Sequence, residues 1–159
     1  MEETNGVGTT QFGSHLTLDG YGGDFDKLNS KEIVYKCLDE LVEKLGMHKL
    51  TEPMVVECGA VNPKDSGGFS GFTMIIESHI SVHTFPYRKF VSVDAYTCKG
   101  SIDKEFVVNY FKEAFGLKEV EINYIVRGKK FPAEDIIVKE AEETERSGVG
   151  ALNLQTENI

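Results

Sequence analysis

The sequence predicts a two-layer α/β sandwich of the α+β type, in which two helices cover one face of an antiparallel sheet. Short stretches that alternate polar and apolar residues, as strands do, surround two stretches with apolar residues at helical spacing. An internal echo strengthens the prediction, because LTLDGY (16–21) parallels VSVDAY (91–96), and a polar link and an amphipathic helix ending in Gly follow each. We therefore expect two similar strand-helix-strand units that pair into one sheet.

The first unit begins with HLTLDGY (15–21), which alternates as a strand. Ser30 is a suitable N-cap for a helix that ends at Gly46, because serine accepts bonds from first-turn amides and glycine suits a helix end. Between them, apolar residues recur at helical spacing: Ile33, Cys37, Leu38, Leu41 and Leu45. The next expected strand is PMVVECGAV (53–61), and a Gly-rich loop, KDSGGFSG (64–71), follows it.

The second unit contains FTMIIESHISVHTF (72–85) and KFVSVDAYTC (89–98), which read as further strands. SIDKEFVVNYFKEAFG (101–116) predicts the second helix, with one apolar face formed by Phe106, Val107, Tyr110, Phe111 and Ala114. The last expected strand is LKEVEINYIV (117–126).

The length of the chain, 159 residues, fits one domain with a core of its own. We expect this single domain at 12–132, between a disordered N-terminal segment at 1–11 and an acidic, flexible tail at 133–159. No apolar run approaches the roughly 20 residues of a membrane helix, so no membrane partner is expected. The start, MEETNGVGTTQ, is acidic and polar where a secretory signal is basic and then apolar, which predicts a cytoplasmic location.

Charge and cysteine usage narrow the functional classes. The formal charge of −9 repels phosphate backbones, so nucleic acid is not an expected partner, whereas a small cationic molecule is favoured. The three Cys residues are odd in number and have no CxxC spacing, which fits reduced thiols rather than a disulfide framework.

Reactive residues concentrate in IIESHISVHTFPYRKFVSVDAYTC (75–98). A metal site is disfavoured, because His79 and His83 are four residues apart on a strand, where that spacing spans roughly 13 Å. A serine hydrolase is also disfavoured, because GGFSG around Ser70 does not spell the GxSxG elbow. Taken alone, Cys98 and His83 fit core residues and Ser70 fits a loop cap, so only their joint spacing indicates chemistry.

This stretch resembles the prokaryotic class of S-adenosylmethionine decarboxylases, small pyruvoyl-dependent enzymes of polyamine and spermidine biosynthesis. The resemblance runs through SGFTMIIESHISVHTFP (70–86) and VDAYTC (93–98), and it covers residues 12–127 more loosely. Its most specific part is ESHISVHT followed by a Cys fifteen residues after the second His.

The resemblance implies a proenzyme that cuts itself between Glu77 and Ser78, leaving a β chain of 1–77 and an α chain that begins at residue 78. Ser78 becomes the pyruvoyl group, which forms a Schiff base with the substrate amine and takes up the electrons released as CO2 leaves. His83 is implied as the base of processing, and it must reach Ser78 through curvature or a neighbouring strand. Ser70 is implied to assist processing from the Gly-rich loop, and Cys98 to return a proton to the substrate.

The chain departs from the family where the substrate binds, which leaves two substrates open. The family reads HTWPE where this chain reads HTFPY, so Tyr87 replaces a carboxylate that binds ribose, and Lys64 replaces an aromatic residue that stacks on adenine. If the substrate is S-adenosylmethionine, Phe85 supplies an apolar ring and Asp65 or Asp94 an acidic contact. If it is a basic amino acid, L-arginine or L-ornithine, its cationic end meets Asp65 or Asp19 instead.

The resemblance also implies a homodimer of processed protomers with sites between them, and no metal cofactor. A hypothesis of another class is an inactive homologue that regulates a partner through a mixed dimer. The presence together of Ser78, His83 and Cys98 argues against it. Chain cleavage, seen on a denaturing gel, discriminates the two.

Overall fold

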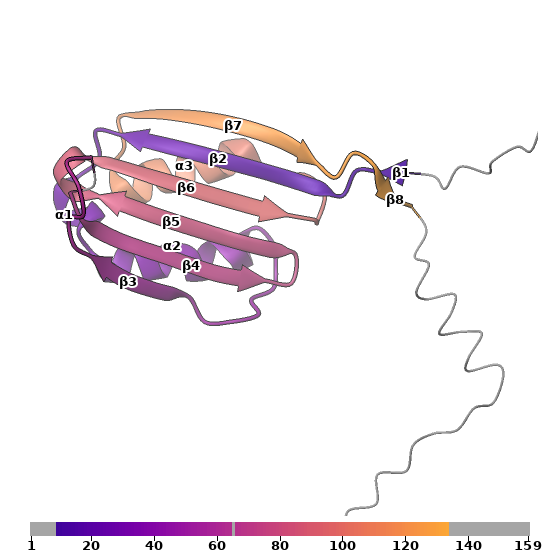
Figure 1. Cartoon of the computed structure of the whole chain (residues 1–159), viewed down its shortest axis with the longest axis horizontal. Coiled ribbons are helices and arrows are strands. Elements are labelled where there is room, and N and C mark those ends of the chain that lie inside the picture. Colours follow the sequence, from indigo (N-terminus) through magenta and orange to yellow (C-terminus); the bar gives the residue numbers. More distant parts are fainter. Residues whose placement is uncertain (1–8, 65, 134–159) are drawn as a thin grey trace, which may run out of the picture.

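The computed structural model describes residues 9–64 and 66–133. Its main feature is a six-stranded antiparallel sheet in the order β3-β4-β5-β6-β2-β7 (Figure 1). The strands are β2 (Gly13–Tyr21), β3 (Met54–Cys58), β4 (Gly68–Ile75), β5 (Ser78–Phe85), β6 (Phe90–Thr97) and β7 (Glu119–Arg127). The helices are α1 (Phe25–Leu28), α2 (Lys31–Lys44) and α3 (Lys104–Phe115), and a 3-10 turn, η1 (Pro86–Arg88), joins β5 to β6.

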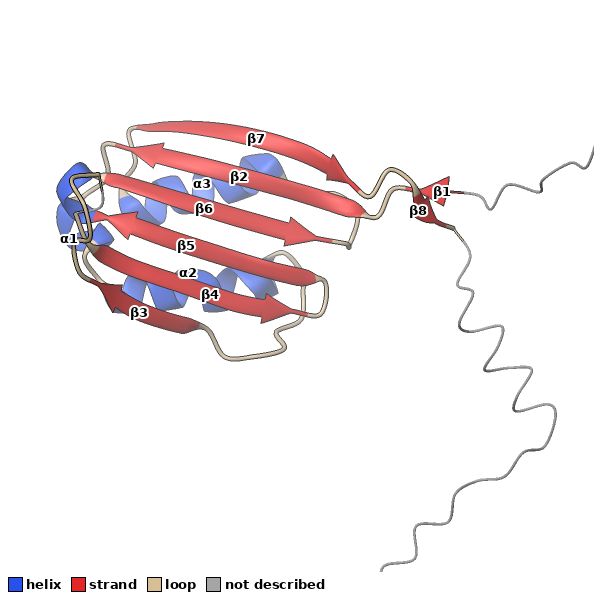
Figure 2. Cartoon of the chain, viewed as in Figure 1, coloured by secondary structure: helices blue, strands red, loops and turns tan. Residues whose placement is uncertain are grey.

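The two long helices lie on the same face of the sheet, α2 over β3, β4 and β5 and α3 over β2 (Figure 2). This confirms the predicted two-layer sandwich. Between the helices and the sheet lies one apolar core, and its largest fully buried side chains include Phe111, Phe115, Leu16, Leu18, Leu38 and Ile80. The opposite face of the sheet carries no helix among the described residues, and we call it the open face.

Both ends of α2 and the end of α3 follow the predicted capping signals, and the N-cap of α3 is Asp103, which the sequence analysis did not name. The Ser30 hydroxyl accepts a hydrogen bond from the Ile33 amide at 3.3 Å, and α2 ends just before Gly46, whose φ is 64°. Asp103 caps α3 in the same way through the Phe106 amide at 3.0 Å, and Gly116, also with a φ of 64°, ends it. Each cap satisfies an amide that the helix leaves unpaired, so the sequence signals fix where the helices begin.

The two echoing segments lie side by side, because β2 and β6 pair directly with Leu18 opposite Val93. The units they begin, β2-α2-β3 and β6-α3-β7, interlock rather than stack, since β2 lies between β6 and β7. This arrangement places β5, which carries Ser78, His83 and Phe85, near the centre of the sheet, and Cys98 directly follows the neighbouring strand β6.

The expected loop at 64–71 is partly a strand. Gly68 to Gly71 belong to β4, and Ser70 therefore lies in a strand opposite His83 rather than in a loop. The glycines explain the difference: a Cβ at Gly68 would overlap the carbonyl oxygen of Thr84, and one at Gly71 would lie 2.6 Å from Leu38. These glycines permit close approach within the sheet, which in the sequence looks the same as turn chemistry.

The predicted boundary at residue 12 also differs from the structure. Thr9 and Thr10 form a short strand, β1, that pairs with β8 (Phe131–Pro132). The rings of Phe12 and Phe131 lie 4.6 Å apart beside this pair and hold the two ends of the described chain together. The rest of the two predicted terminal segments, residues 1–8 and 134–159, lies outside the described residues.

Candidate active site

The predicted cleavage point lies in the tight turn between β4 and β5. Ile76 and Glu77 form the turn, and Ile75 pairs directly with Ser78 across it. Ser78 has a φ of 146°, a conformation that side-chain-bearing L-residues rarely adopt and that costs on the order of 1–3 kcal/mol. The strained residue is therefore the one whose peptide bond the resemblance selects for cleavage.

The carbonyl group of Glu77 accepts a hydrogen bond from the main-chain amide of Cys98 at 2.8 Å. Ser78 pairs with Thr97 on β6, which brings Cys98 beside the turn with an exposed thiol. An amide that donates to this carbonyl withdraws electron density from its carbon and stabilises negative charge on its oxygen. This is the polarisation that attack on the Glu77 carbonyl requires.

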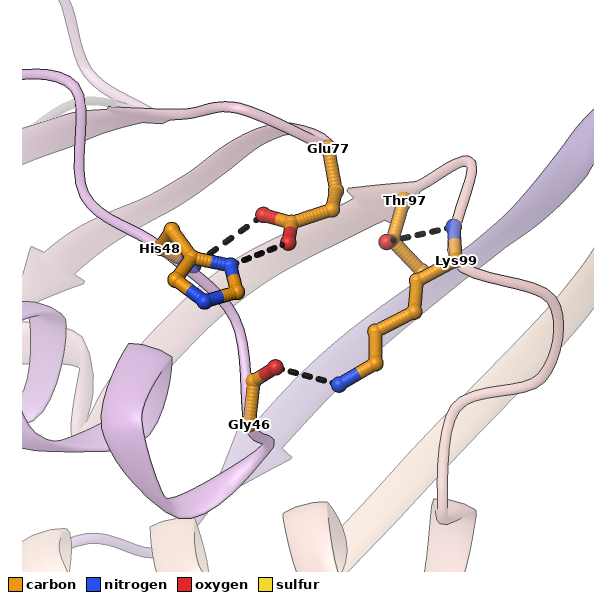
Figure 3. Close-up of polar contacts among 5 residues, drawn as sticks. All are labelled: Gly46, His48, Glu77, Thr97 and Lys99. Atoms are coloured by element: carbon orange, nitrogen blue, oxygen red, sulfur yellow. Dashed lines mark hydrogen bonds and ion pairs between the residues drawn. The ribbon is translucent and has the colours of Figure 1, made fainter.

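The side chain of Glu77 is held as well (Figure 3). Its carboxylate accepts hydrogen bonds from the main-chain amide of His48 at 3.1 Å and from the ring Nδ1 of His48 at 2.9 Å. Burial disfavours the charged form of this carboxyl, but the hydrogen bonds from His48 outweigh it and hold the pKa of Glu77 below its usual range. The residue on the amino side of the predicted cut is thus fixed through both its carbonyl and its side chain.

His83 and Ser70 form a second cluster. They are cross-strand partners on β5 and β4, and His83 Nδ1 lies 2.9 Å from Ser70 Oγ. The thiol of Cys58, on β3, donates to Ser70 Oγ at 3.4 Å. Because Ile80, Val82 and Thr84 of β5 are buried toward the helices, the alternating His83 lies on the open face. A hydroxyl, an imidazole and a thiol are thus joined across three strands.

The two clusters do not meet within one chain. Ser78 and His83 are the first and sixth residues of β5, and five residues of extended strand span about 16 Å. Neither curvature nor a neighbouring strand brings them together, because Ser78 pairs with Ile75 and Thr97 while His83 pairs with Ser70 and Ser92. The predicted route from His83 to Ser78 is thus absent from the single chain.

The residues predicted to bind substrate lie toward the His83 cluster. Phe85 ends β5, and its ring centroid lies 5.7 Å from that of Phe90. Tyr87, in η1, is 74% exposed, and its ring packs edge-on against Phe25. Lys64 is exposed in the loop before β4, which Arg88 of η1 contacts through the carbonyl of Pro63. Asp65 lies outside the described residues.

The two other acids named as candidates lie on the open face. Asp94 accepts a hydrogen bond from His15 Nε2 at 2.9 Å, so its carboxylate already has a partner. Asp19 lies on β2, in the same row of the sheet as His83 and Ser92. Of the two, Asp19 is the one aligned with the His83 cluster.

The sequence did not lead us to predict a site role for three residues that contact the predicted ones: Cys58, His48 and His15. Cys58 could have been found from the sequence, because it lies in a predicted strand on the face opposite to the buried Val55. His48 gave no such signal, since it follows a helix in a segment with no motif.

Other site types find little support in the part of the chain that the structure describes. No three His, Cys, Asp or Glu side chains there gather in a way that could hold a metal ion. No helix among those residues is long and apolar enough to cross a membrane. A hollow of about 610 Å³ between α2 and α3 lies on the helical layer and includes none of the predicted site residues.

Comparisons with known proteins agree with the resemblance. Residues 14–128 match the family model described as S-adenosylmethionine decarboxylase. An S-adenosylmethionine decarboxylase proenzyme of Clostridium botulinum (strain Langeland) is 36% identical over 117 residues, covering 74% of this chain and 95% of that protein. A proenzyme of the same name from Brevibacillus brevis is 31% identical, with 74% and 83% covered.

A solved structure agrees in fold. The crystal structure of the adenosylmethionine decarboxylase from Aquifex aeolicus superposes with a TM-score of 0.60 at 25% identity, covering 79% of this chain and 96% of that one. The β4-β5 turn, Cys98 and the His83 cluster all lie within the segment that the family model matches.

Proposed function

Since the chain belongs to the S-adenosylmethionine decarboxylase family, we propose that it is a proenzyme that cleaves itself between Glu77 and Ser78 and then decarboxylates S-adenosylmethionine. The family is pyruvoyl-dependent, and in this chain Ser78 is the residue from which the pyruvoyl group forms. The observation that carries the assignment is the strained turn in which the Glu77 carbonyl accepts the Cys98 amide. Once formed, the group supplies the electron sink for loss of CO2.

In the proposed self-cleavage, the Ser78 hydroxyl attacks the carbonyl carbon of Glu77, and the Cys98 amide stabilises the oxyanion. The Glu77–Ser78 peptide bond breaks as the acyl group moves to the hydroxyl oxygen, which leaves an ester and a free amine on residue 78. A base then removes the Cα proton of residue 78, and Glu77 departs as a carboxylate. Water replaces the nitrogen of residue 78, which leaves as ammonia, and a ketone remains.

We assign the base to His83 of a second protomer, because a His83 about 16 Å along the same strand cannot remove that proton. In a twofold-symmetric dimer, if residue i of one protomer contacts residue j of the other, then residue j of the first also contacts residue i of the second. Two sheets packed through their open faces, with their β5 strands running in opposite directions, bring the β4-β5 turn of each protomer, at the start of β5, toward the partner's His83 cluster. Each dimer then holds two sites, both composite.

The open face supports this homodimer because it exposes apolar side chains that water does not favour: Tyr21, Met54, Val56, Phe72, Met74 and Ile125. These residues lie on four strands of the same face as the His83 cluster. A second copy that covers them buries the polar cluster and this apolar surface in one step, and it keeps bulk water from the site.

The substrate is tested by carbon dioxide release. We expect the purified, processed protein to release labelled CO2 from carboxyl-labelled S-adenosylmethionine and not from L-arginine or L-ornithine, because the relatives matched here are named for the former. Scintillation counting of trapped CO2 gives the rate, and the Ser78→Ala variant is the control for release that needs no pyruvoyl group.

Release from arginine or ornithine alone would contradict the assigned substrate without affecting the chemistry. It would mean that Tyr87 and Lys64 mark a pocket rebuilt for a basic amino acid. The names of the relatives do not favour that alternative.

Cys98 contributes a main-chain amide and a thiol, and a substitution of its side chain tests the thiol alone. Cys98→Ala keeps the main-chain amide that donates to Glu77 and removes only the thiol. We expect chain cleavage to proceed, while kcat falls by about 10²-fold because the substrate carbon loses its proton donor. Stopped-time assays of product, combined with mass spectrometry of the α chain for transamination of the pyruvoyl group, measure both effects. Unchanged turnover would remove the thiol from that role.

A further inference from the structure

A short segment that follows α2 lies beside the cleavage turn. The Ile76 amide donates to the His48 carbonyl at 2.9 Å, and the Leu50 amide donates to the Met74 carbonyl at 2.9 Å. Lys49 forms a bridge with Ile75. Residues 48–50 thus extend the line of β3 along the end of β4, and they border the turn on the side away from β6.

His48 holds the Glu77 carboxylate with two donors on one residue (Figure 3). The main-chain amide of His48 bonds one carboxylate oxygen at 3.1 Å, and its Nδ1 bonds the other at 2.9 Å. The Glu77 side chain is only 11% exposed, whereas that of His48 is 70% exposed. The carboxylate therefore depends on His48 for hydrogen bonds that water would otherwise supply.

Lys99 forms a second connection between the segments on either side of the turn. The ammonium group of Lys99 donates to the carbonyl of Gly46, and the Lys99 amide donates to Thr97 Oγ1 at 3.1 Å (Figure 3). The segment after α2 and the end of β6 are thus joined directly by Lys99. They are also joined through Glu77, which binds His48 with its side chain and Cys98 with its carbonyl.

We propose that His48 is a positioning residue for self-cleavage, which fixes Glu77 so that its carbonyl stays on the Cys98 amide while Ser78 attacks. The inference rests on the proposed function, because it assigns His48 a role in that cleavage. Apart from the Cys98 amide, the side-chain bonds to His48 are what fix the Glu77 residue in this two-residue turn. Misplacement of a reacting carbonyl by about 1 Å can cost 10²-fold in rate. His48 restricts Glu77 from outside the reacting atoms and is not needed after the bond is cut.

The test compares rates of cleavage during cell-free synthesis of the full chain, measured by denaturing gel and intact mass. We expect His48→Ala to slow the appearance of the two fragments about tenfold, because a bond to a charged group is lost. His48→Asn, whose amide nitrogen can donate from near the Nδ1 position, should restore the rate to within about threefold of the parent. Once processing is complete, both variants should release CO2 per cleaved chain at the parent rate, because His48 acts before the pyruvoyl group exists.

A matched control separates positioning from general loosening of the segment. Lys49→Ala removes the ion pair of Lys49 with Asp39, which ties the same segment to α2 without touching Glu77. We expect that variant to cleave at the parent rate even where its melting temperature falls.

Three outcomes overturn the inference. Cleavage of His48→Ala at the parent rate shows that the contact is not needed. Equal slowing in His48→Asn or in Lys49→Ala shows that the segment acts only through stability. Failure of the parent chain to cleave at all refutes the proposed function itself, and it is recognised because every variant, including the parent, then remains one chain.

Discussion

Ser78→Ala is expected to leave one uncut chain of 17.7 kDa with no decarboxylase activity. Alanine has no hydroxyl to attack the Glu77 carbonyl, so neither the ester nor the pyruvoyl group can form. The loss is complete rather than partial, because residue 78 is the only residue whose side chain directly follows the scissile bond, and alanine there cannot replace the hydroxyl. Intact mass measurement and a denaturing gel of the purified variant give the result directly.

The control for this experiment is Ser101→Ala, an exposed serine that follows β6 and lies outside the turn. It should be cleaved and active as the parent is. Two fragments from Ser78→Ala would refute the assigned cleavage point, and an uncut parent chain would favour the inactive, regulatory homologue instead.

Co-expression of Ser78→Ala with His83→Ala chains is expected to restore cleavage that neither variant shows alone. In a composite site, Ser78 of the His83→Ala chain faces the partner's intact His83, so the mixed dimer holds one complete set of groups. The second site of the same dimer lacks both groups and stays inactive. Only the His83→Ala chain should therefore be cut, and only in the mixed dimer.

Different affinity tags on the two chains allow purification of the mixed dimer, and mass spectrometry then shows which chain is cut. A site formed within one chain predicts the opposite result, because the His83→Ala chain would have no base for its own Ser78. No cleavage in the mixed dimer, or elution of the parent as a monomer, would therefore contradict the shared site. Treatment of His83→Ala homodimers with hydroxylamine adds an internal check, since a stalled ester should be cleaved at residue 78.

The sequence predicted the layers of the fold well because the signals were local. Ser30 and Gly46 mark the ends of α2 by their own chemistry, and the apolar spacing of α3 identifies the face that carries Phe111. The interlocked order of strands was less accessible, because pairing of β2 with both β6 and β7 depends on contacts between distant segments. The prediction of a loop at 64–71 was wrong for Gly68 to Gly71, because glycine occurs both in turns and at close approaches within a sheet.

For the site as well, local motifs were predictable and contacts between distant segments were not. Ser78 and Cys98 were predicted from the motif, and the structure brings them to one turn through the pairing of Ser78 with Thr97. His83 was predicted too, but the motif did not show that the extended strand separates it from Ser78 by about 16 Å. That separation is why we propose a second protomer as the source of the base. His48 was out of reach, because only tertiary structure brings residue 48 beside residue 77.

The position of the proposed cut, in a turn between two paired strands, has a consequence for the lifetime of the processed enzyme. Cleavage there would leave β4 and β5 adjacent in the sheet, so the two fragments would stay together through the β4-β5 hydrogen bonds and the shared core. Once unfolded, however, they would have to find each other as separate molecules, and refolding would depend on their concentration rather than on the chain alone. The proposed reaction would thus make unfolding irreversible, so that the working life of the enzyme would be set by how slowly it unfolds rather than by an equilibrium.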